Sequence, residues 1–130
     1  MDHVFLDANV LFSAAYRANS GLLKLWKLKS VVLCSSRYAL EEARVNLATD
    51  SQRAQLEILG EQLHFFDAFT GKLPSGVVLP NKDAPILLSA IQAAATHLLT
   101  GDLQHFGRYF GTKIEGIEIL PPAAYLKRAL

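Results

Sequence analysis

The sequence predicts a three-layer α/β/α domain with a central parallel sheet of four to five strands. Short apolar runs rich in β-branched or aromatic residues recur along the chain without polar alternation, as is typical of strands buried on both faces. Longer stretches with apolar residues at helical spacing lie between these runs. Strands and helices that alternate in this way build a parallel sheet flanked by helices. We expect one domain spanning residues 1–130.

The expected strands are short, and the last is the weakest because Glu118 interrupts its apolar run. In chain order they are His3–Leu6, Val31–Cys34, Leu63–Phe66, His97–Thr100 and Ile117–Leu120.

Several expected helices carry a recognisable signal at one end. Ser35 or Ser36 can cap the helix that follows it, Gly60 is a natural helix stop, and Pro85 lies just inside a helix start, where proline is tolerated. The glycine- and proline-containing segment Thr70–Lys82 is expected to be a loop. In chain order the expected helices are Asn9–Ala18, Gly21–Lys29, Arg37–Leu47, Gln52–Leu59, Ala84–Ala95 and Pro122–Ala129.

Composition restricts the class of protein. A chain that is 51% hydrophobic and 19% charged is not disordered. No apolar run approaches the roughly 20 residues needed to cross a bilayer, so we expect no membrane segment. The start of the chain has no signal-peptide pattern and Cys34 has no partner cysteine, so we expect a cytoplasmic protein. A net charge of +1 means that a local patch or a metal must hold any anionic partner.

Acidic residues from distant parts of the sequence are predicted to meet at one edge of the sheet. Two of them directly follow strands, one precedes a helix that leads back to the same edge, and one lies between one and two turns into a helix. In parallel sheets, ligands bind beyond the carboxyl ends of the strands, where the strand order reverses. The expected catalytic and metal-binding residues are Asp7, Glu42, Asp83 and Asp102.

Clustered carboxylates repel one another unless a cation lies among them. Oxygen ligands suit Mg²⁺ or Mn²⁺, which polarises a phosphoryl oxygen and lowers the pKa of a bound water. The sequence contains neither a zinc-type cluster of His and Cys nor a glycine-rich phosphate-binding motif. The expected chemistry is therefore metal-assisted attack on a phosphodiester or a phosphate.

Each acid also has a structural alternative. Asp83 and Asp102 could cap helices, and Glu42 could be a solvated surface charge like its neighbour Glu41. Asp7 is the hardest to explain in this way, because an acid directly after a buried strand has no routine structural role. Several coincidences would be required together, so the combined structural explanation is weaker than any single one.

Four segments of the chain resemble the PIN domain, a metal-dependent nuclease family. The first three are FLDANVLFSA, SSRYALEEARVNL and KDAPILLSAIQAAATHLLTGDLQHF, and the fourth is the proline-led tail ILPPAAYL. Together they span nearly the whole chain. The third segment is the most specific, because it joins an acid, a helix of fixed length, an apolar strand and the triplet T-G-D.

The resemblance implies a PIN-like fold, Mg²⁺ or Mn²⁺ as cofactor, and single-stranded RNA as substrate, cleaved by metal-activated water to leave a 5′-phosphate. It also implies that Asn9 and Thr100 are polar supports beside the metal. Many small members are toxins of toxin–antitoxin pairs, often dimeric and inhibited by a partner protein. We therefore expect an antitoxin partner and a homodimer. The family's catalytic acids correspond to Asp7, Glu42, Asp83 and Asp102.

The sequence departs from the family pattern after Asp102. Many members carry a further acid there, but this chain reads Leu103-Gln104-His105-Phe106. This departure puts a second metal site in doubt and leaves open a PIN-like domain that binds RNA or protein with little or no cleavage.

Basic side chains near the same edge are candidate RNA contacts, namely Lys82, Arg37 and His105. A third interpretation is a phosphatase of the haloacid dehalogenase type, whose nucleophilic acid also follows the first strand. Asn9 disfavours it, because that chemistry needs a second acid at this position.

Overall fold

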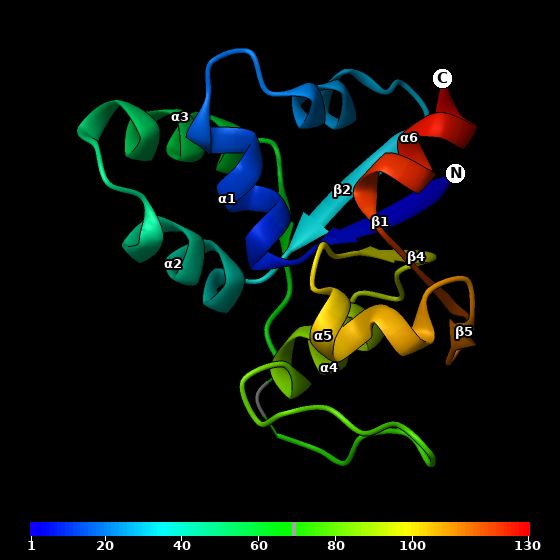
Figure 1. Ribbon diagram of the computed structural model, residues 1–130. Coiled ribbons are helices and arrows are strands. Elements are labelled where there is room, and N and C mark those ends of the chain that lie inside the picture. Colours follow the sequence, from blue (N-terminus) through cyan, green and yellow to red (C-terminus); the bar gives the residue numbers. More distant parts are fainter. Residues whose placement is uncertain (69) are drawn as a thin grey trace.

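The computed structural model describes residues 1–68 and 70–130 and contains one mixed sheet in the order β3-β2-β1-β4-β6-β5 (Figure 1). Five strands pair in parallel, and β5 is antiparallel to β6. The strands of the described residues are β1 Asp2–Leu6, β2 Val31–Ser35, β3 His64–Phe65, β4 His97–Leu99, β5 Lys113–Ile114 and β6 Ile117–Leu120.

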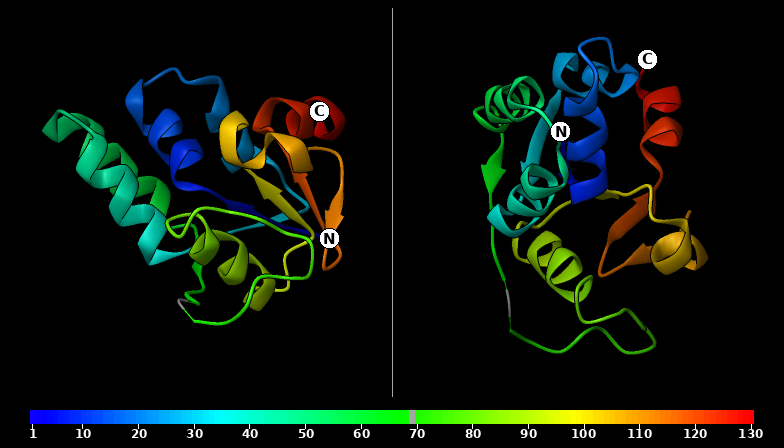
Figure 2. Two further views of the ribbon diagram at one scale, coloured as in Figure 1. Left: turned by 60° about the horizontal axis from the view of Figure 1, so that its bottom comes forward. Right: turned by 60° about the vertical axis from the view of Figure 1, so that its left-hand side comes forward.

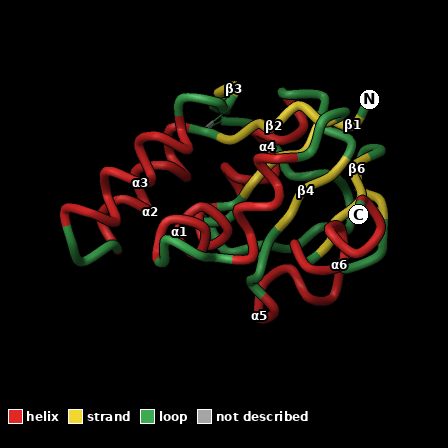
Figure 3. The backbone as a smooth tube through the Cα atoms, turned by 90° about the horizontal axis from the view of Figure 1, so that it is seen from above, coloured by secondary structure: helices red, strands yellow, loops and turns green. Residues whose placement is uncertain are grey.

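Helices cover both faces of this sheet. Helices α1 and α6 lie on one face and α4 lies on the other (Figure 2). Helices α2 and α3 stand as a pair at one side of the molecule, next to α1 (Figure 3). The helices of the described residues are α1 Ala8–Tyr16, η1 Gly21–Lys27, α2 Arg37–Asn46, α3 Asp50–Gly60, α4 Ala84–Gln92, α5 Leu103–Phe106, η2 Gly107–Tyr109 and α6 Pro122–Ala129.

The predicted three-layer α/β/α class is confirmed, and several elements differ in detail. The expected helix at Gly21–Lys29 is the 3-10 helix η1, which ends at Lys27. Helix α4 ends at Gln92, earlier than expected, and Ala94 then adopts a left-handed conformation with φ 53°. The short strand β5 was not predicted, and it turns into β6 through Glu115 and Gly116, both at positive φ. The predicted loop Thr70–Lys82 has no helix or strand in the structure.

The central strands form the core of the domain. Their middle residues are completely enclosed, with Phe5 in β1, Leu98 in β4 and Ile119 in β6 each 0% exposed. This burial on both faces explains why these strands show no polar alternation in the sequence. No helix among the described residues is long and apolar enough to cross a membrane.

The strand order reverses between β1 and β4. The chain passes from β1 to β2 and β3 on one side, whereas β4 is followed by β6 on the other. Backbone hydrogen bonds hold the carboxyl ends of these strands together, with Asp7 N donating to Leu99 O at 3.0 Å and Thr100 N to Leu120 O at 3.0 Å. Such a switch point is where ligands bind in open α/β sheets.

Candidate active site

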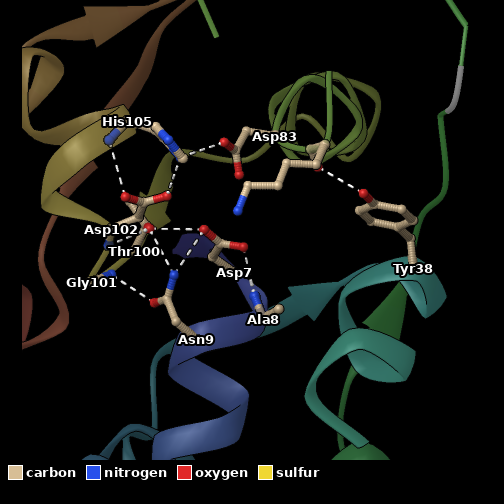
Figure 4. Close-up of polar contacts among 10 residues, drawn as sticks. Asp7, Ala8, Asn9, Tyr38, Asp83, Thr100, Gly101, Asp102 and His105 are labelled. Atoms are coloured by element: carbon tan, nitrogen blue, oxygen red, sulfur yellow. Dashed lines mark hydrogen bonds and ion pairs between the residues drawn. The ribbon is translucent and has the colours of Figure 1, made fainter. Parts of the chain in front are cut away.

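Asp7 lies at the switch point and is almost completely buried, with 3% of its surface exposed. Its Oδ1 accepts a hydrogen bond from Ala8 N at 2.7 Å, and its Oδ2 accepts from Thr100 Oγ1 at 2.8 Å and from Asn9 Nδ2 at 3.2 Å (Figure 4). Asp7 is thus the N-cap of α1. The expectation that it has no routine structural role was wrong, because α1 begins directly after it and exposes its first amide.

Asn9 and Thr100 join the ends of β1 and β4 around Asp7. Asn9 Oδ1 accepts from Gly101 N at 2.7 Å, and Asn9 Nδ2 also approaches Thr100 Oγ1 at 3.2 Å. Thr100 Oγ1 accepts in turn from Asp102 N at 3.1 Å. A Cβ at Gly101 would lie 3.3 Å from Asn9 Oδ1, so glycine permits this close approach. This network fixes the orientation of the Asp7 carboxylate.

Asp83, Asp102 and His105 form a second group of contacts in the same region (Figure 4). His105 Nδ1 lies 2.8 Å from Asp83 Oδ2 and 2.9 Å from Asp102 Oδ2. A single N–H cannot point well at two acceptors, and the hydrogen-bond geometry favours Asp102. Asp83 Oδ2 is consequently buried without a hydrogen bond from any described residue.

The structural alternatives for these two aspartates have different outcomes. Asp102 does cap α5, because its Oδ1 accepts from His105 N at 3.0 Å. Asp83 precedes α4, but within the described chain its side chain makes no capping hydrogen bond. Capping therefore does not explain a buried acid at position 83.

Glu42 and Glu41 point in different directions from α2. Glu41 is exposed and pairs with Arg44, with 2.8 Å between Arg44 Nε and Glu41 Oε2. Glu42 instead lines a cavity of about 540 Å³ at the carboxyl ends of the strands. The acids that line this cavity are the four predicted from the sequence, Asp7, Glu42, Asp83 and Asp102.

The gathered charges oppose ionisation of the buried acids. Burial raises the pKa of Asp7 from 3.8 to about 6, helped by the charges of Asp83 and Glu42 and opposed by the hydrogen bonds from Thr100 and Ala8. Burial also raises the pKa of Asp83, although His105 and Lys82 act against it. Burial, with the neighbouring carboxylates adding to it, thus disfavours the ionised form of both acids in the absence of a cation.

The donor set fits a hard divalent cation. The ligand atoms of Asp83, Asp102 and His105 all lie within 4.8 Å of one another. A positive ion among these carboxylates would favour their ionised form and would give the buried Asp83 Oδ2 a stronger partner than the shared His105 nitrogen. These three side chains, with Asp7 and Glu42 on the same cavity, are the residues that could hold Mg²⁺ or Mn²⁺.

The predicted RNA contacts do not form one patch. Lys82 lines the cavity, whereas neither Arg37 nor His105 is among its described lining residues. The Arg37 guanidinium lies over the Phe65 ring, 4.6 Å from its centroid. His105 was expected to face RNA, but it contacts the two aspartates. The contact between His105 and Asp102 could have been predicted, because the two residues are three positions apart at a helix start. The contact with Asp83 could not, because it depends on tertiary structure.

The fold and the cavity define a three-layer α/β/α domain with an acidic site at its switch point. Comparison with protein-family models and with curated proteins gave no match. Among solved structures, the chain is similar to a chain of VapBC2 from Rickettsia felis, bound to a DNA fragment from their promoter. The TM-score is 0.67 at 20% sequence identity, over 92% of this chain and 98% of that chain. The PIN-like fold predicted from the sequence is confirmed.

Proposed function

We propose that this chain is a Mg²⁺- or Mn²⁺-dependent endoribonuclease that hydrolyses single-stranded RNA. The observation that carries the proposal is the cavity shared by carboxylates from separate segments of the chain, Asp7, Glu42, Asp83 and Asp102. One of their buried oxygens, Asp83 Oδ2, is approached by His105 Nδ1 at 2.8 Å, but that nitrogen is better placed to bond Asp102. Such an arrangement is costly in a metal-free fold and is typical of sites that bind divalent cations.

The chain's own residues would prepare the site for hydrolysis. A bound divalent ion supplies a water of lowered pKa and polarises a phosphoryl oxygen. Asp83, Asp102 and His105 offer ligand atoms close to one another. Three hydrogen bonds hold the Asp7 carboxylate in one orientation. It can therefore accept a proton, or bind a metal ion, at a fixed place in the cavity. The Lys82 ammonium is a cation on the cavity lining that can meet an RNA phosphate.

Cleavage of a labelled single-stranded RNA tests this function. We expect cutting with Mg²⁺ or Mn²⁺, none with EDTA, and products that carry a 5′-phosphate. Asp7→Asn and Glu42→Gln should each lower the rate by at least about 100-fold, because each removes a carboxylate from the cavity.

Glu41→Gln is the matched control for Glu42→Gln. It makes the same chemical change one residue away, at a side chain that pairs with Arg44, so its rate should stay close to that of the wild type. If the wild type and Asp7→Asn behave alike and EDTA has no effect, the proposal is wrong.

We also propose that the chain is the toxin of a toxin–antitoxin pair in the cytoplasm. The support is the resemblance to small PIN-domain toxins, together with the similarity of fold to a chain of the VapBC2 complex. Co-expression with the protein encoded by the adjacent reading frame should give a stable complex and suppress RNA cleavage. Light scattering on the isolated chain tests the expected homodimer.

A second candidate function is a PIN-like domain that binds RNA or protein without cutting. One observation favours it: His105 stands in the region where many family members carry a further acid, with Nδ1 between Asp83 and Asp102. Metal binding without RNA cleavage under any metal condition would support this candidate against the nuclease.

A further inference from the structure

One face of α1 carries two aromatic side chains, Phe12, which is partly buried against the core, and Tyr16, which is exposed, and this aromatic stripe begins at the acidic cavity. Asn9, Phe12 and Tyr16 follow one another at helical spacing, so they share one face. The opposite face is buried through Val10, Leu11, Ala14 and Ala15. Tyr16 is 48% exposed although it is a large aromatic side chain. Packing of the core therefore explains the apolar residues on the other face of α1. It does not explain why a large aromatic side chain is exposed at position 16.

Two cavities meet at Phe12. One is the acidic cavity, and the other has a volume of about 360 Å³ and is lined by Phe12, Ser13, Tyr16, Arg17 and Asn19, among others. The second cavity offers aromatic rings, a hydroxyl, an amide and a guanidinium, with no carboxylate side chain among its described lining residues. Its chemistry thus differs from that of its acidic neighbour.

The rings are arranged so that one aromatic surface remains accessible. The Phe12 and Tyr16 centroids lie 5.4 Å apart with an interplanar angle of 37°, and Arg17 Cζ lies 6.0 Å from the Tyr16 centroid. Tyr16 thus contacts Phe12 and has the Arg17 guanidinium over its ring, and 48% of the Tyr16 surface remains exposed. From Asn9 to Tyr16 the helix rises about 10 Å, a length over which a strand leaving the carboxylates can lie along α1.

We propose that Phe12, Tyr16 and Arg17 form a nucleobase-binding subsite for single-stranded RNA, a proposal that rests on the nuclease function above. Exposed bases of single-stranded RNA stack on aromatic rings and on guanidinium planes, and this stacking tolerates any base. Arg17 also supplies the positive charge that an RNA phosphate needs. The continuity with the acidic cavity through Phe12 and the lining without carboxylates favour RNA over a polypeptide as occupant.

A fluorescent octaribonucleotide with one 2-aminopurine tests the subsite. Its fluorescence falls when the base stacks, and the label is moved along the strand in separate oligonucleotides. Binding is measured in Ca²⁺, with electrophoresis confirming that the strand stays intact. We expect quenching at one label position near the cleavage site. Tyr16→Ala should abolish that quenching and weaken affinity about tenfold. Tyr16→Phe keeps the ring and should match the wild type within about twofold.

Ile58→Ala is the control for losing an exposed apolar side chain elsewhere, because Ile58 is 54% exposed on α3. If the wild type binds and cuts RNA but Tyr16→Ala does both equally well, the subsite is overturned and the nuclease function stands. If Tyr16→Ala leaves RNA binding intact and instead disrupts binding to the antitoxin, the stripe is a protein interface and the subsite is likewise overturned. If the wild type neither binds nor cuts RNA in Mg²⁺ or Mn²⁺, the proposed function fails and the subsite fails with it.

Discussion

At the scale of single residues, Asp7 combines a structural and a chemical role. Its three hydrogen bonds begin α1 and join β1 to β4, yet burial still raises its pKa to about 6. Hydrogen bonds alone therefore do not offset the desolvation of this carboxylate. A residue that serves only as a helix cap does not need such burial, since exposed residues also form the capping hydrogen bond, as Thr49 does for α3.

The raised pKa of Asp7 predicts that the metal-free protein loses stability as the pH rises. Between 3.8 and about 6 the folded protein keeps a proton that the unfolded chain has released. The stabilisation from this proton is therefore present below pH 3.8 and is lost as the pH rises through about 6. Between pH 4.5 and 7.5 we expect the Asp7 contribution to the free energy of unfolding to fall by about 2 kcal/mol.

Urea unfolding of the wild type and of Asp7→Asn in EDTA measures this contribution. An asparagine does not titrate, so the variant lacks this loss. Between pH 4.5 and 7.5 the free energy of unfolding of the wild type should therefore fall by about 2 kcal/mol relative to that of the variant. If the free energy of unfolding depends on pH equally in the two proteins, Asp7 does not keep its proton in the folded state and the prediction is wrong.

The parts of the candidate site that depend on local sequence could be predicted, and the parts that depend on long-range contacts could not. The four acids were found because their places relative to strand ends follow from counting residues along the chain. The choice of Glu42 over Glu41 depended on the phase of α2, and the structure gives only Glu42 to the cavity. His105 was assigned another role because its contact with Asp83 joins α5 to the start of α4, and no spacing in the sequence encodes that distance.

At the scale of elements, two tyrosines bond the loop before α4: Tyr109 at Val78, and Tyr38, whose Oη donates to Lys82 O at 2.8 Å. Tyr109 Oη accepts from Val78 N at 2.8 Å and donates to Val78 O at 3.2 Å. Val78 is itself 68% exposed, so its side chain does little to anchor the loop. The hydroxyl of Tyr109 thus holds this loop at Val78, whereas Tyr38 holds it at Lys82.

Tyr109→Phe removes both hydrogen bonds and keeps the ring. We expect the Val78 amide to exchange its hydrogen faster, with a loss of about 1 kcal/mol in the free energy of unfolding. RNA cleavage should weaken only slightly, through a higher KM, because Tyr38 still holds Lys82 while the segment before it is less firmly placed. Hydrogen exchange resolved by residue measures the effect, with Tyr16→Phe as control for loss of a tyrosine hydroxyl far from this loop. Unchanged protection at Val78 would contradict the anchoring role.

The elements themselves were predictable where they bury a continuous apolar run. Strand β1 and its neighbours were found within one or two residues of their ends, because their burial leaves a direct trace in the sequence. Strand β5 has two residues and depends on pairing with β6, so it leaves no such trace. Helix η1 has apolar spacing that suits an α-helix, and the sequence pattern does not distinguish that helix from a 3-10 helix.

At the scale of the whole molecule, the sheet topology explains why separate acids meet. Parallel strands end at the same edge, and the reversal between β1 and β4 leaves a crevice there. The convergence could therefore be inferred once the strands and their direction were known. The cavity shared between Phe12 and the carboxylates could not be inferred, because it depends on how α1 and α2 pack over that edge.

The same topology predicts that a divalent ion stabilises the entire fold. The candidate ligands come from segments that only the folded chain brings together, so Mn²⁺ should bind the native state and not the unfolded chain. At 100 times the dissociation constant, this linkage adds about 2.7 kcal/mol and raises Tm by roughly 10 °C. The rise should be larger at pH 8 than at pH 5, because protonated Asp7 and Asp83 compete with the metal.

Thermal unfolding with and without Mn²⁺ measures this stabilisation, and variants locate it in the chain. Asp83→Asn should abolish the rise, because it removes a buried carboxylate from the group of ligand atoms formed with Asp102 and His105. His105→Ala should weaken Mn²⁺ binding at least about tenfold, since its imidazole contacts both Asp83 and Asp102. His64→Ala alters an exposed histidine on β3 and should leave the rise intact. A rise that survives Asp83→Asn, or that His64→Ala removes as readily as His105→Ala, would place the ion elsewhere on the surface and would contradict the candidate site.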